Sequence, residues 1–134
     1  MPSIFGPMTV GEILDRLKDI ARTPADPCVG ADRERCVIID WNNLSPGGFS
    51  SYRGYYDHLA ICFDGKSPPN LSAFTRDLEA QIGAVHTGWK GGEYTMFAST
   101  PVWVANPGCC AGWGVASVRD DDGYSVTLVT QMFD

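Results

Sequence analysis

The residues of this sequence that are best suited to chemistry gather in two segments that also contain glycine. The first segment, residues 50–58, contains Arg53, Tyr55, Tyr56 and His58. An arginine guanidinium is a rigid fork that binds phosphate through two hydrogen bonds. A tyrosine ring can stack on a nucleobase, which is worth about 1–3 kcal/mol per base. The pattern predicts a site for a small nucleotide-like anion, with the base on a ring and the phosphate on the arginine.

The second segment is the glycine-rich stretch around Trp89 and Lys90. Its indole offers another stacking surface, its ammonium another positive charge, and its glycines let a ligand approach the backbone closely. The stretch is not a Walker phosphate loop, because it lacks the spacing and the following Ser or Thr of that motif. A purely structural explanation stays open for both segments. In that explanation the rings lie at the rim of the core, and Arg53 pairs with Asp57 or Glu93.

Groups for catalysis are sparse. His58 follows Asp57, but adjacent residues of a strand point to opposite faces. Neither Cys109 nor Cys110 stands in a recognisable nucleophile pattern with a histidine. The histidines are also far from any closely spaced cysteine pair, which disfavours zinc. We therefore expect a binding protein with no catalytic residue, cofactor or metal; the alternative is an enzyme that uses His58 as a base.

A third unusual stretch runs from Asn106 to Gly114 and is rich in small residues. Small side chains permit another backbone to pack closely, so this stretch is either a pocket wall or a contact between subunits. A plain wide turn before a strand explains it equally well. We include Asn106 among the candidate ligand-binding residues.

The overall charge restricts the partners. The chain has 134 residues, and 10 Lys or Arg against 16 Asp or Glu give a formal net charge of −6. Its cations are scattered singly, whereas a general nucleic-acid binder needs a basic face, so duplex nucleic acid is excluded as a ligand. Apolar runs are too short to span a membrane, and no secretory signal opens the chain. The five cysteines are odd in number and include no C-x-x-C pair, which indicates reduced thiols in a reducing compartment, so we expect a cytoplasmic protein.

Two amphipathic helices are predicted to position these segments. The first, residues 9–22, opens with a capping-box pattern and repeats apolar residues with a helical period. The second is capped by Asn70 or Ser72, and its apolar face extends to Ile82. Gly83 follows where a left-handed cap is expected.

Alternating apolar residues predict the strands, and clusters of Gly, Pro, Asn and Asp predict the turns. Together they indicate one α+β domain over residues 1–134, in which two helices cover a twisted, mainly antiparallel sheet. The predicted strands are 36–41, 52–63, 93–97, 101–105, 111–119 and 124–133, and the predicted loops and turns include 23–35, 42–51, 64–69 and 120–123.

Three motifs resemble those of a group of small hypothetical proteins encoded by tailed bacteriophages. They are residues 51–60 (SYRGYYDHLA), 87–96 (TGWKGGEYTM) and 100–106 (TPVWVAN). The resemblance covers about residues 36–119 and the opening helix, and its poor match at 25–35 indicates a variable loop. It implies a phage origin, but no activity is attached to these motifs.

Small phage proteins without enzymatic activity often counter host defence, and one class sequesters nucleotide second messengers of the Thoeris and CBASS systems. By analogy with that class, we expect a homo-oligomeric sponge in the host cytosol that holds such a messenger without cleaving it. The alternative is an acidic protein that binds and inhibits a host defence enzyme, because a negative surface can mask a basic cleft.

Overall fold

Two helices form close to where the sequence predicts them. α1 (Val10–Ala21) begins with the predicted capping box: the backbone N–H of Thr9 donates to Glu12 Oε1 at 2.9 Å, and the N–H of Glu12 donates to Thr9 Oγ1 at 3.3 Å. α2 (Leu71–Glu79) is capped by Asn70, whose side chain accepts a backbone N–H at 2.8 Å. The cap choice left open by the sequence is thereby decided.

The end of α2 differs from the prediction. The helix ends at Glu79 with Ala80 as its C-cap, so Ile82 lies in the following turn with 42% of its surface exposed and does not join the apolar face of the helix. Gly83 does have the predicted left-handed backbone, with φ of +85°. Its N–H donates to the carbonyl of Met96 at 2.7 Å, which ties the turn to the later part of the chain.

The strands form one large sheet and one small hairpin in this computed structural model, which is a single α+β domain. It describes residues 7–22, 36–40, 46–52, 55–63, 68–88, 91–104, 113–120 and 125–132, without the side chains of Tyr55, Tyr56 and Phe63. The sheet has the order β1-β8-β7-β6-β3-β2. Its strands are β1 (Cys36–Ile39), β2 (Pro46–Tyr52), β3 (Tyr55–Phe63), β6 (Val102–Val104), β7 (Trp113–Asp120) and β8 (Ser125–Met132).

The large sheet is mixed. The pairs β2–β3, β6–β7 and β7–β8 are antiparallel, and the antiparallel β7–β8 pair agrees with the hairpin that the sequence predicts. The pairs β1–β8 and β3–β6 are parallel and join strands far apart in the chain. The two edge strands β1 and β2 also approach each other, so the sheet is nearly closed and barrel-like.

Strand β2 was not expected, and its presence corrects the sequence analysis. Residues 42–51 were predicted as a turn and 52–63 as one strand, but the chain forms a β2–β3 hairpin with Tyr52 paired to Tyr55. The Pro and Gly residues that indicated a turn are tolerated here because β2 is an edge strand. Phe49 of β2 packs against the ring of Phe74 on α2, with the ring centroids 5.8 Å apart.

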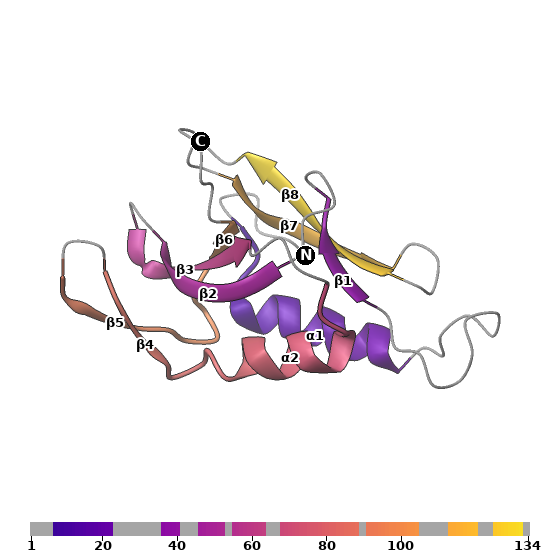
Figure 1. Ribbon diagram of the computed structural model, residues 1–134, viewed down its shortest axis with the longest axis horizontal. Helices are drawn as coiled ribbons and strands as arrows, with labels where there is room; N and C mark the ends of the chain where they lie inside the picture. The colour runs from indigo at the N-terminus through magenta and orange to yellow at the C-terminus, as the bar shows by residue number, and fades with distance from the viewer. Residues whose placement is uncertain are drawn as a thin grey trace.

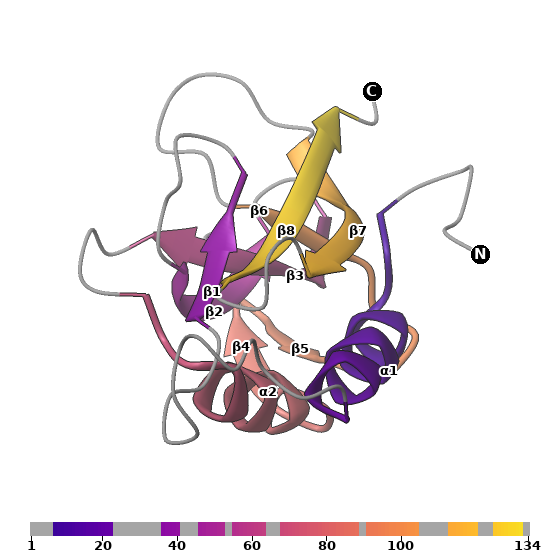
Figure 2. The same cartoon turned by 90° about the vertical axis from the view of Figure 1, so that its right-hand side faces the viewer.

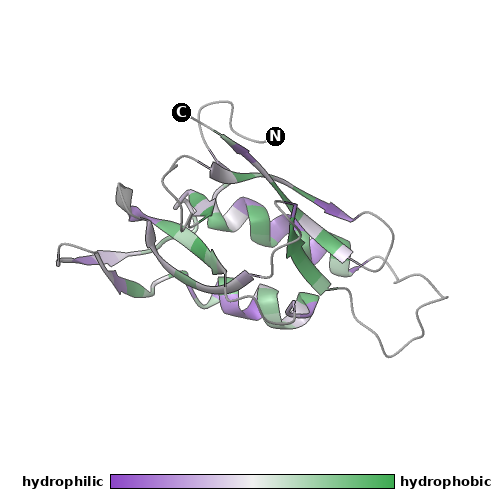
Figure 3. Ribbon diagram, turned by 45° about the horizontal axis from the view of Figure 1, so that its top comes forward, coloured by the Kyte–Doolittle hydropathy of each residue, from purple (hydrophilic) through white to green (hydrophobic). Residues whose placement is uncertain are grey.

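The hydrophobic core lies between the helices and one face of the sheet. In Figures 1 and 2 the two helices lie next to each other beneath the curved sheet, and in Figure 3 both carry hydrophobic as well as hydrophilic residues. Fully buried core residues include Ile13 and Leu17 of α1, Leu78 of α2 and Leu59 and Ile61 of β3. Strands β3 and β6 pack against this core with one face, which fixes the position of the residues on their other face.

A small hairpin, β4 (Val85–Thr87) and β5 (Glu93–Thr95), extends beyond the sheet (Figure 1). The sequence predicted a strand over residues 93–97, of which β5 covers 93–95, and it did not predict β4. The predicted loop 23–35 and the turn tip 121–123 lie outside the described residues. No helix in the described ranges is long and apolar enough to cross a membrane.

Candidate functional site

Seven residues were predicted to bind ligand, and the structure describes them unequally. Arg53, Trp89, Lys90 and Asn106 lie outside the described residues. Tyr55 and Tyr56 are placed on β3 by their backbone alone. His58 is the predicted residue whose side chain is described, and the candidate site is therefore built outward from it.

His58 lies at an irregularity of the β2–β3 hairpin. The register passes from the pair Tyr52–Tyr55 directly to Ser51–Leu59, so β3 has three additional residues there, 56 to 58. Such a bulge re-aims side chains and is frequent beside binding sites. In the chain, His58 stands three residues after Tyr55, the β3 member of the last pair of this hairpin, and Arg53 follows Tyr52.

Aromatic rings pack against each other on the sheet face that is opposite the core. Val102 and Val104 point into the core, so Trp103 between them points to the other face, where it joins Tyr52 and Ala60. The rings of Tyr52 and Trp103 are stacked, with centroids 4.8 Å apart and planes 9° apart. We call Tyr52, His58 and Trp103 the ring cluster.

The third ring is held by a hydrogen bond. Trp103 Nε1 donates to His58 Nδ1 at 2.9 Å. The two ring planes are 11° apart with centroids separated by 6.2 Å. Because an indole N–H lies in its own ring plane, this bond places the imidazole edge to edge with the indole and nearly coplanar with it. His58 therefore extends the plane of Trp103, while Tyr52 covers a face of that indole.

The surroundings of His58 favour its neutral form. Burial lowers the pKa of His58 from its ordinary value, and the nearby Asp57 carboxylate partly opposes this effect. His58 Nε2 lies 3.9 Å from Asp57 Oδ1, and a quarter of the His58 side chain is exposed. Protonation at Nδ1 would also place a second donor against the indole N–H, and this repulsion likewise favours the neutral form of His58.

The hydrogen bond also determines what the neutral imidazole can do. An indole nitrogen is only a donor, so His58 Nδ1 accepts and its proton resides on Nε2. A neutral His58 therefore has no spare lone pair with which to remove a proton. In this arrangement it presents a hydrogen-bond donor and suits the recognition of an acceptor atom better than general-base catalysis.

Trp103 and Tyr52 are the members of the ring cluster that were missing from the predicted site. Both lie in motifs singled out in the sequence, and a signal for Trp103 was present. In the strand Val102–Val104 a tryptophan alternates with two valines, which predicts that it faces away from them. The alternation does not reveal that Trp103 contacts His58, because the β3–β6 pairing joins segments that are distant in the chain.

The second predicted segment forms the end of the β4–β5 hairpin. Gly91 donates to the carbonyl of Gly88, and Gly88 donates to that of Gly92, each at 2.9 Å. Gly91 has a φ of +91°, which matches a short hairpin loop that ends in a left-handed glycine. Strand β4 contacts β2, and β5 contacts β3. In Figures 1 and 3 this hairpin lies on the side of the molecule where β3 begins.

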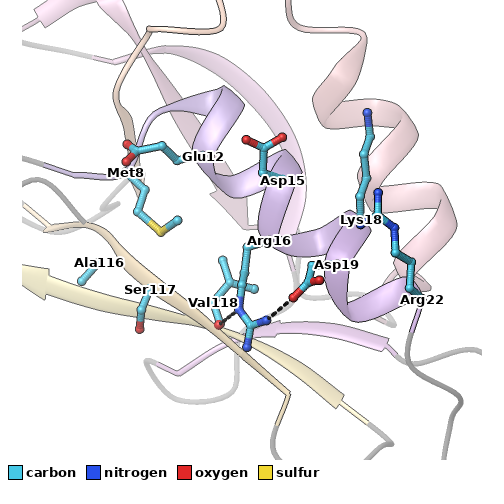
Figure 4. A pocket seen from close by; sticks show the side chains of 10 residues that line it. All are labelled: Met8, Glu12, Asp15, Arg16, Lys18, Asp19, Arg22, Ala116, Ser117 and Val118. Carbon is cyan, nitrogen blue, oxygen red and sulfur yellow. Dashed lines mark hydrogen bonds and ion pairs between the residues drawn. The ribbon is translucent and has the colours of Figure 1, made fainter. Parts of the chain in front are cut away.

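A groove of about 670 Å³ between α1 and β7 contains none of the predicted site residues (Figure 4). Three acidic and three basic residues line it, and two of its cations have partners. Arg16 donates to the Val118 carbonyl at 3.2 Å and to Asp19 Oδ2 at 3.1 Å. Lys18 Nζ lies 2.6 Å from Glu79 Oε2. The contacts with Val118 and Glu79 join α1 to β7 and α2, and the groove lining has equal numbers of acidic and basic residues.

Neither metal-binding groups nor similarity to known proteins adds to this description of the site. Within the described part of the chain, no group of three or more His, Cys, Asp or Glu residues is arranged to hold a metal ion. Comparison with protein-family models, with curated proteins and with solved structures finds no match to this chain. The candidate site therefore depends on its own geometry.

Proposed function

We propose that this protein binds a small nucleotide-like anion beside the ring cluster and holds it without cleaving it. In the setting that the phage resemblance implies, it is an anti-defence sponge for a cyclic nucleotide or an ADP-ribose-type messenger in the host cytosol. The observation that carries the proposal is the bond from Trp103 to His58 Nδ1 within the stacked ring cluster. It supports recognition of an acceptor by rigidly held aromatic residues.

The absence of turnover in the proposal rests on the protonation state of His58. A base must offer a lone pair near pH 7, whereas the neutral imidazole here carries its proton on Nε2 and uses Nδ1 to accept from Trp103. An enzyme that used His58 as a base would first have to break that bond. This favours binding over the enzymatic alternative.

The affinity required is demanding. A sponge that does not consume its ligand must reach a nanomolar Kd, which corresponds to about −12 kcal/mol. Stacking of one base provides about 1–3 kcal/mol, and each charge-assisted phosphate contact about 1.5–3 kcal/mol. The net charge of −6 opposes anion capture at long range, so nearby cations must dominate. Arg53 and Lys90 are the residues proposed for this role.

The test is a binding-and-release experiment. The protein is incubated with ADP-ribose or with 3′,3′-cyclic GMP-AMP, separated from free ligand, and then denatured by heat. We expect the intact compound to be recovered in the supernatant in a stoichiometric amount. Recovery of an altered compound would instead support the enzymatic alternative, and failure to bind ADP-ribose derivatives or cyclic dinucleotides by calorimetry would refute the proposal.

Matched variants give this experiment a control. Arg53→Gln and Lys90→Gln each remove a proposed phosphate contact and keep a polar side chain. Each is expected to weaken binding by about 10- to 100-fold, from the worth of one charge-assisted hydrogen bond. Arg76→Gln, at an exposed position of α2 outside the two predicted segments, removes the same charge and is expected to leave binding unchanged.

The proposed homo-oligomer is supported by three exposed apolar residues, Ile82, Val85 and Phe97, which we call the apolar patch. They lie at the base of the small hairpin, where backbone hydrogen bonds join Gly83 and Ala84 to Met96. Ile82, Val85 and Phe97 are 42%, 54% and 58% exposed. Met96 is fully buried, so its neighbour Phe97 points away from the core. Contact of this patch with a second copy would join the two small hairpins near their bases.

Sedimentation velocity over a range of concentrations tests this contact. Phe97→Ser is expected to shift the protein towards the monomer, because it removes the most exposed apolar side chain of the patch. Met132→Ser changes a residue of β8 that is 44% exposed and serves as the control, with no expected effect. A native protein that stays monomeric at all concentrations would contradict the oligomer.

The same patch favours one second candidate function. An acidic chain with an exposed apolar surface suits binding to a host defence enzyme as an inhibitor. A pull-down from host lysate should then capture one stoichiometric partner, lost in Phe97→Ser and weakened by salt. Such a result combined with no binding of nucleotide messengers would favour the inhibitor over the sponge.

A further inference from the structure

Trp103 and His58 differ in the hydrogen bonds that they can make. The indole of Trp103 has a single N–H and only donates, whereas a neutral imidazole has one donor and one acceptor and can exchange them. The 2.9 Å contact between Trp103 Nε1 and His58 Nδ1 is compatible with one arrangement of the imidazole proton. The choice between the two His58 tautomers is therefore made by its neighbour.

Packing keeps this choice in place. Trp103 is 6% exposed and its ring is stacked on Tyr52, which is 5% exposed. The indole therefore cannot turn its N–H elsewhere without disturbing the stack. The backbone contributes as well, because β6 is paired with β3 through Leu59 and Ala60, directly after His58.

We propose that Trp103 is a positioning residue, which fixes His58 as an Nε2–H donor so that the ligand atom recognised by His58 is an oxygen acceptor. This inference rests on the proposed function and deepens it. The acceptor is a phosphate oxygen or a base carbonyl. It either shares the Nε2–H with the group that this N–H contacts in the free protein or displaces that group. A ligand that presents only a donor at this point is rejected, because two N–H groups would face each other.

The neighbours of His58 agree with this role. Tyr52 and Trp103, from β2 and β6, are its aromatic neighbours, and among the described residues Asp57 of β3 is its acidic neighbour. The Asp57 carboxylate lies 3.9 Å from Nε2, which is beyond hydrogen-bond distance. Its attraction for the Nε2 proton favours the same tautomer that the indole selects.

The tautomer is measured in the free protein by long-range ¹H–¹⁵N NMR of the imidazole rings. The chain contains two histidines, so His86→Gln leaves the His58 ring alone in the spectrum. We expect Nε2 protonated and Nδ1 unprotonated in the native protein. Trp103→Phe keeps an aromatic ring against Tyr52 but removes the indole donor, and is expected to give a mixture of both tautomers. A native His58 protonated at Nδ1 would overturn the inference.

Calorimetry with ADP-ribose and with 3′,3′-cyclic GMP-AMP then measures the consequence for binding. His58→Phe removes the donor and is expected to weaken binding of the bound probe about tenfold or more, whereas His58→Gln, which keeps an N–H donor, retains part of the affinity. The affinity of Trp103→Phe is expected to fall between those of the native protein and His58→Phe. If Trp103→Phe misfolds, the contrast between His58→Gln and His58→Phe still decides the donor role.

The possible failures are distinguishable. If the native protein binds neither probe, the proposed function fails and the ligand part of this inference fails with it, while the NMR result still decides whether Trp103 fixes the tautomer. If the native protein binds but His58→Phe binds equally well, the sponge stands and this inference is wrong.

Discussion

The hydrogen bond between Trp103 and His58 can be examined by replacing one or both partners. His58→Phe retains a planar ring but deprives the indole N–H of the acceptor that it has at 2.9 Å. The indole is 6% exposed, so water has little access to it. A buried donor that loses its partner costs about 1–3 kcal/mol, which lowers the Tm by about 4–10 °C for a domain of this size.

The double variant provides the decisive comparison. Trp103→Phe alone costs about 2 kcal/mol through lost apolar contact, but His58, with a quarter of its side chain exposed, can bond water instead. In the double variant no donor is left without an acceptor. The double variant should therefore lose about 1 kcal/mol less unfolding free energy than the sum of the losses in the two single variants. Urea unfolding of the four proteins measures this coupling. Additivity within about 0.5 kcal/mol would refute the reasoning.

Three further predictions concern the fold and its dependence on pH. Thr9→Ala removes the capping box of α1 and should cost about 1 kcal/mol in urea unfolding, whereas Thr9→Ser should be nearly neutral. Gly83→Ala should cost about 1–2 kcal/mol because φ is +85°, although no atom lies within 4 Å of the added methyl group. Because the pKa of His58 is lowered on folding, the unfolded chain binds more protons below about pH 6.5, so stability should fall from there down to the folded pKa. His58→Phe should flatten that part of the stability–pH curve, and an unchanged curve would contradict the assignment.

Most of the local structure could be predicted because it depends on local patterns. The capping box at Thr9, the cap at Asn70 and the left-handed Gly83 are each encoded within a few residues, and all three are observed. Strands β7 and β8 also follow from their alternation, although Asp120, which was predicted in the turn between them, belongs to β7.

The errors arise where tertiary context decides. Pro46 and its two following glycines read as a turn, yet they fit an edge strand that has one open side. Ile82 continues the apolar period of α2 but lies beyond the last helical turn. The parallel β1–β8 and β3–β6 pairs join strands that no short motif connects, so the sequence does not specify them locally.

The same reasoning explains the partial view of the site. His58 stood out because of its residue type and its neighbours in the sequence. Its partner Trp103 lies on a different strand, and only the β3–β6 pairing brings the two together. Whether Arg53, Trp89, Lys90 and Asn106 share this site stays a prediction, since these residues lie outside the described ranges.

Titration of the protein with ADP-ribose and with 3′,3′-cyclic GMP-AMP, followed through the indole N–H signals, tests the central claim directly. The chain has four tryptophans, so the spectrum shows four such signals to assign by single Trp→Phe variants. We predict saturable shifts of the Trp103 and Trp89 signals by at least one compound, with that of Trp113 unchanged. If the Trp103 and Trp89 signals stay constant for both compounds, no such ligand binds beside the ring cluster and the account is wrong.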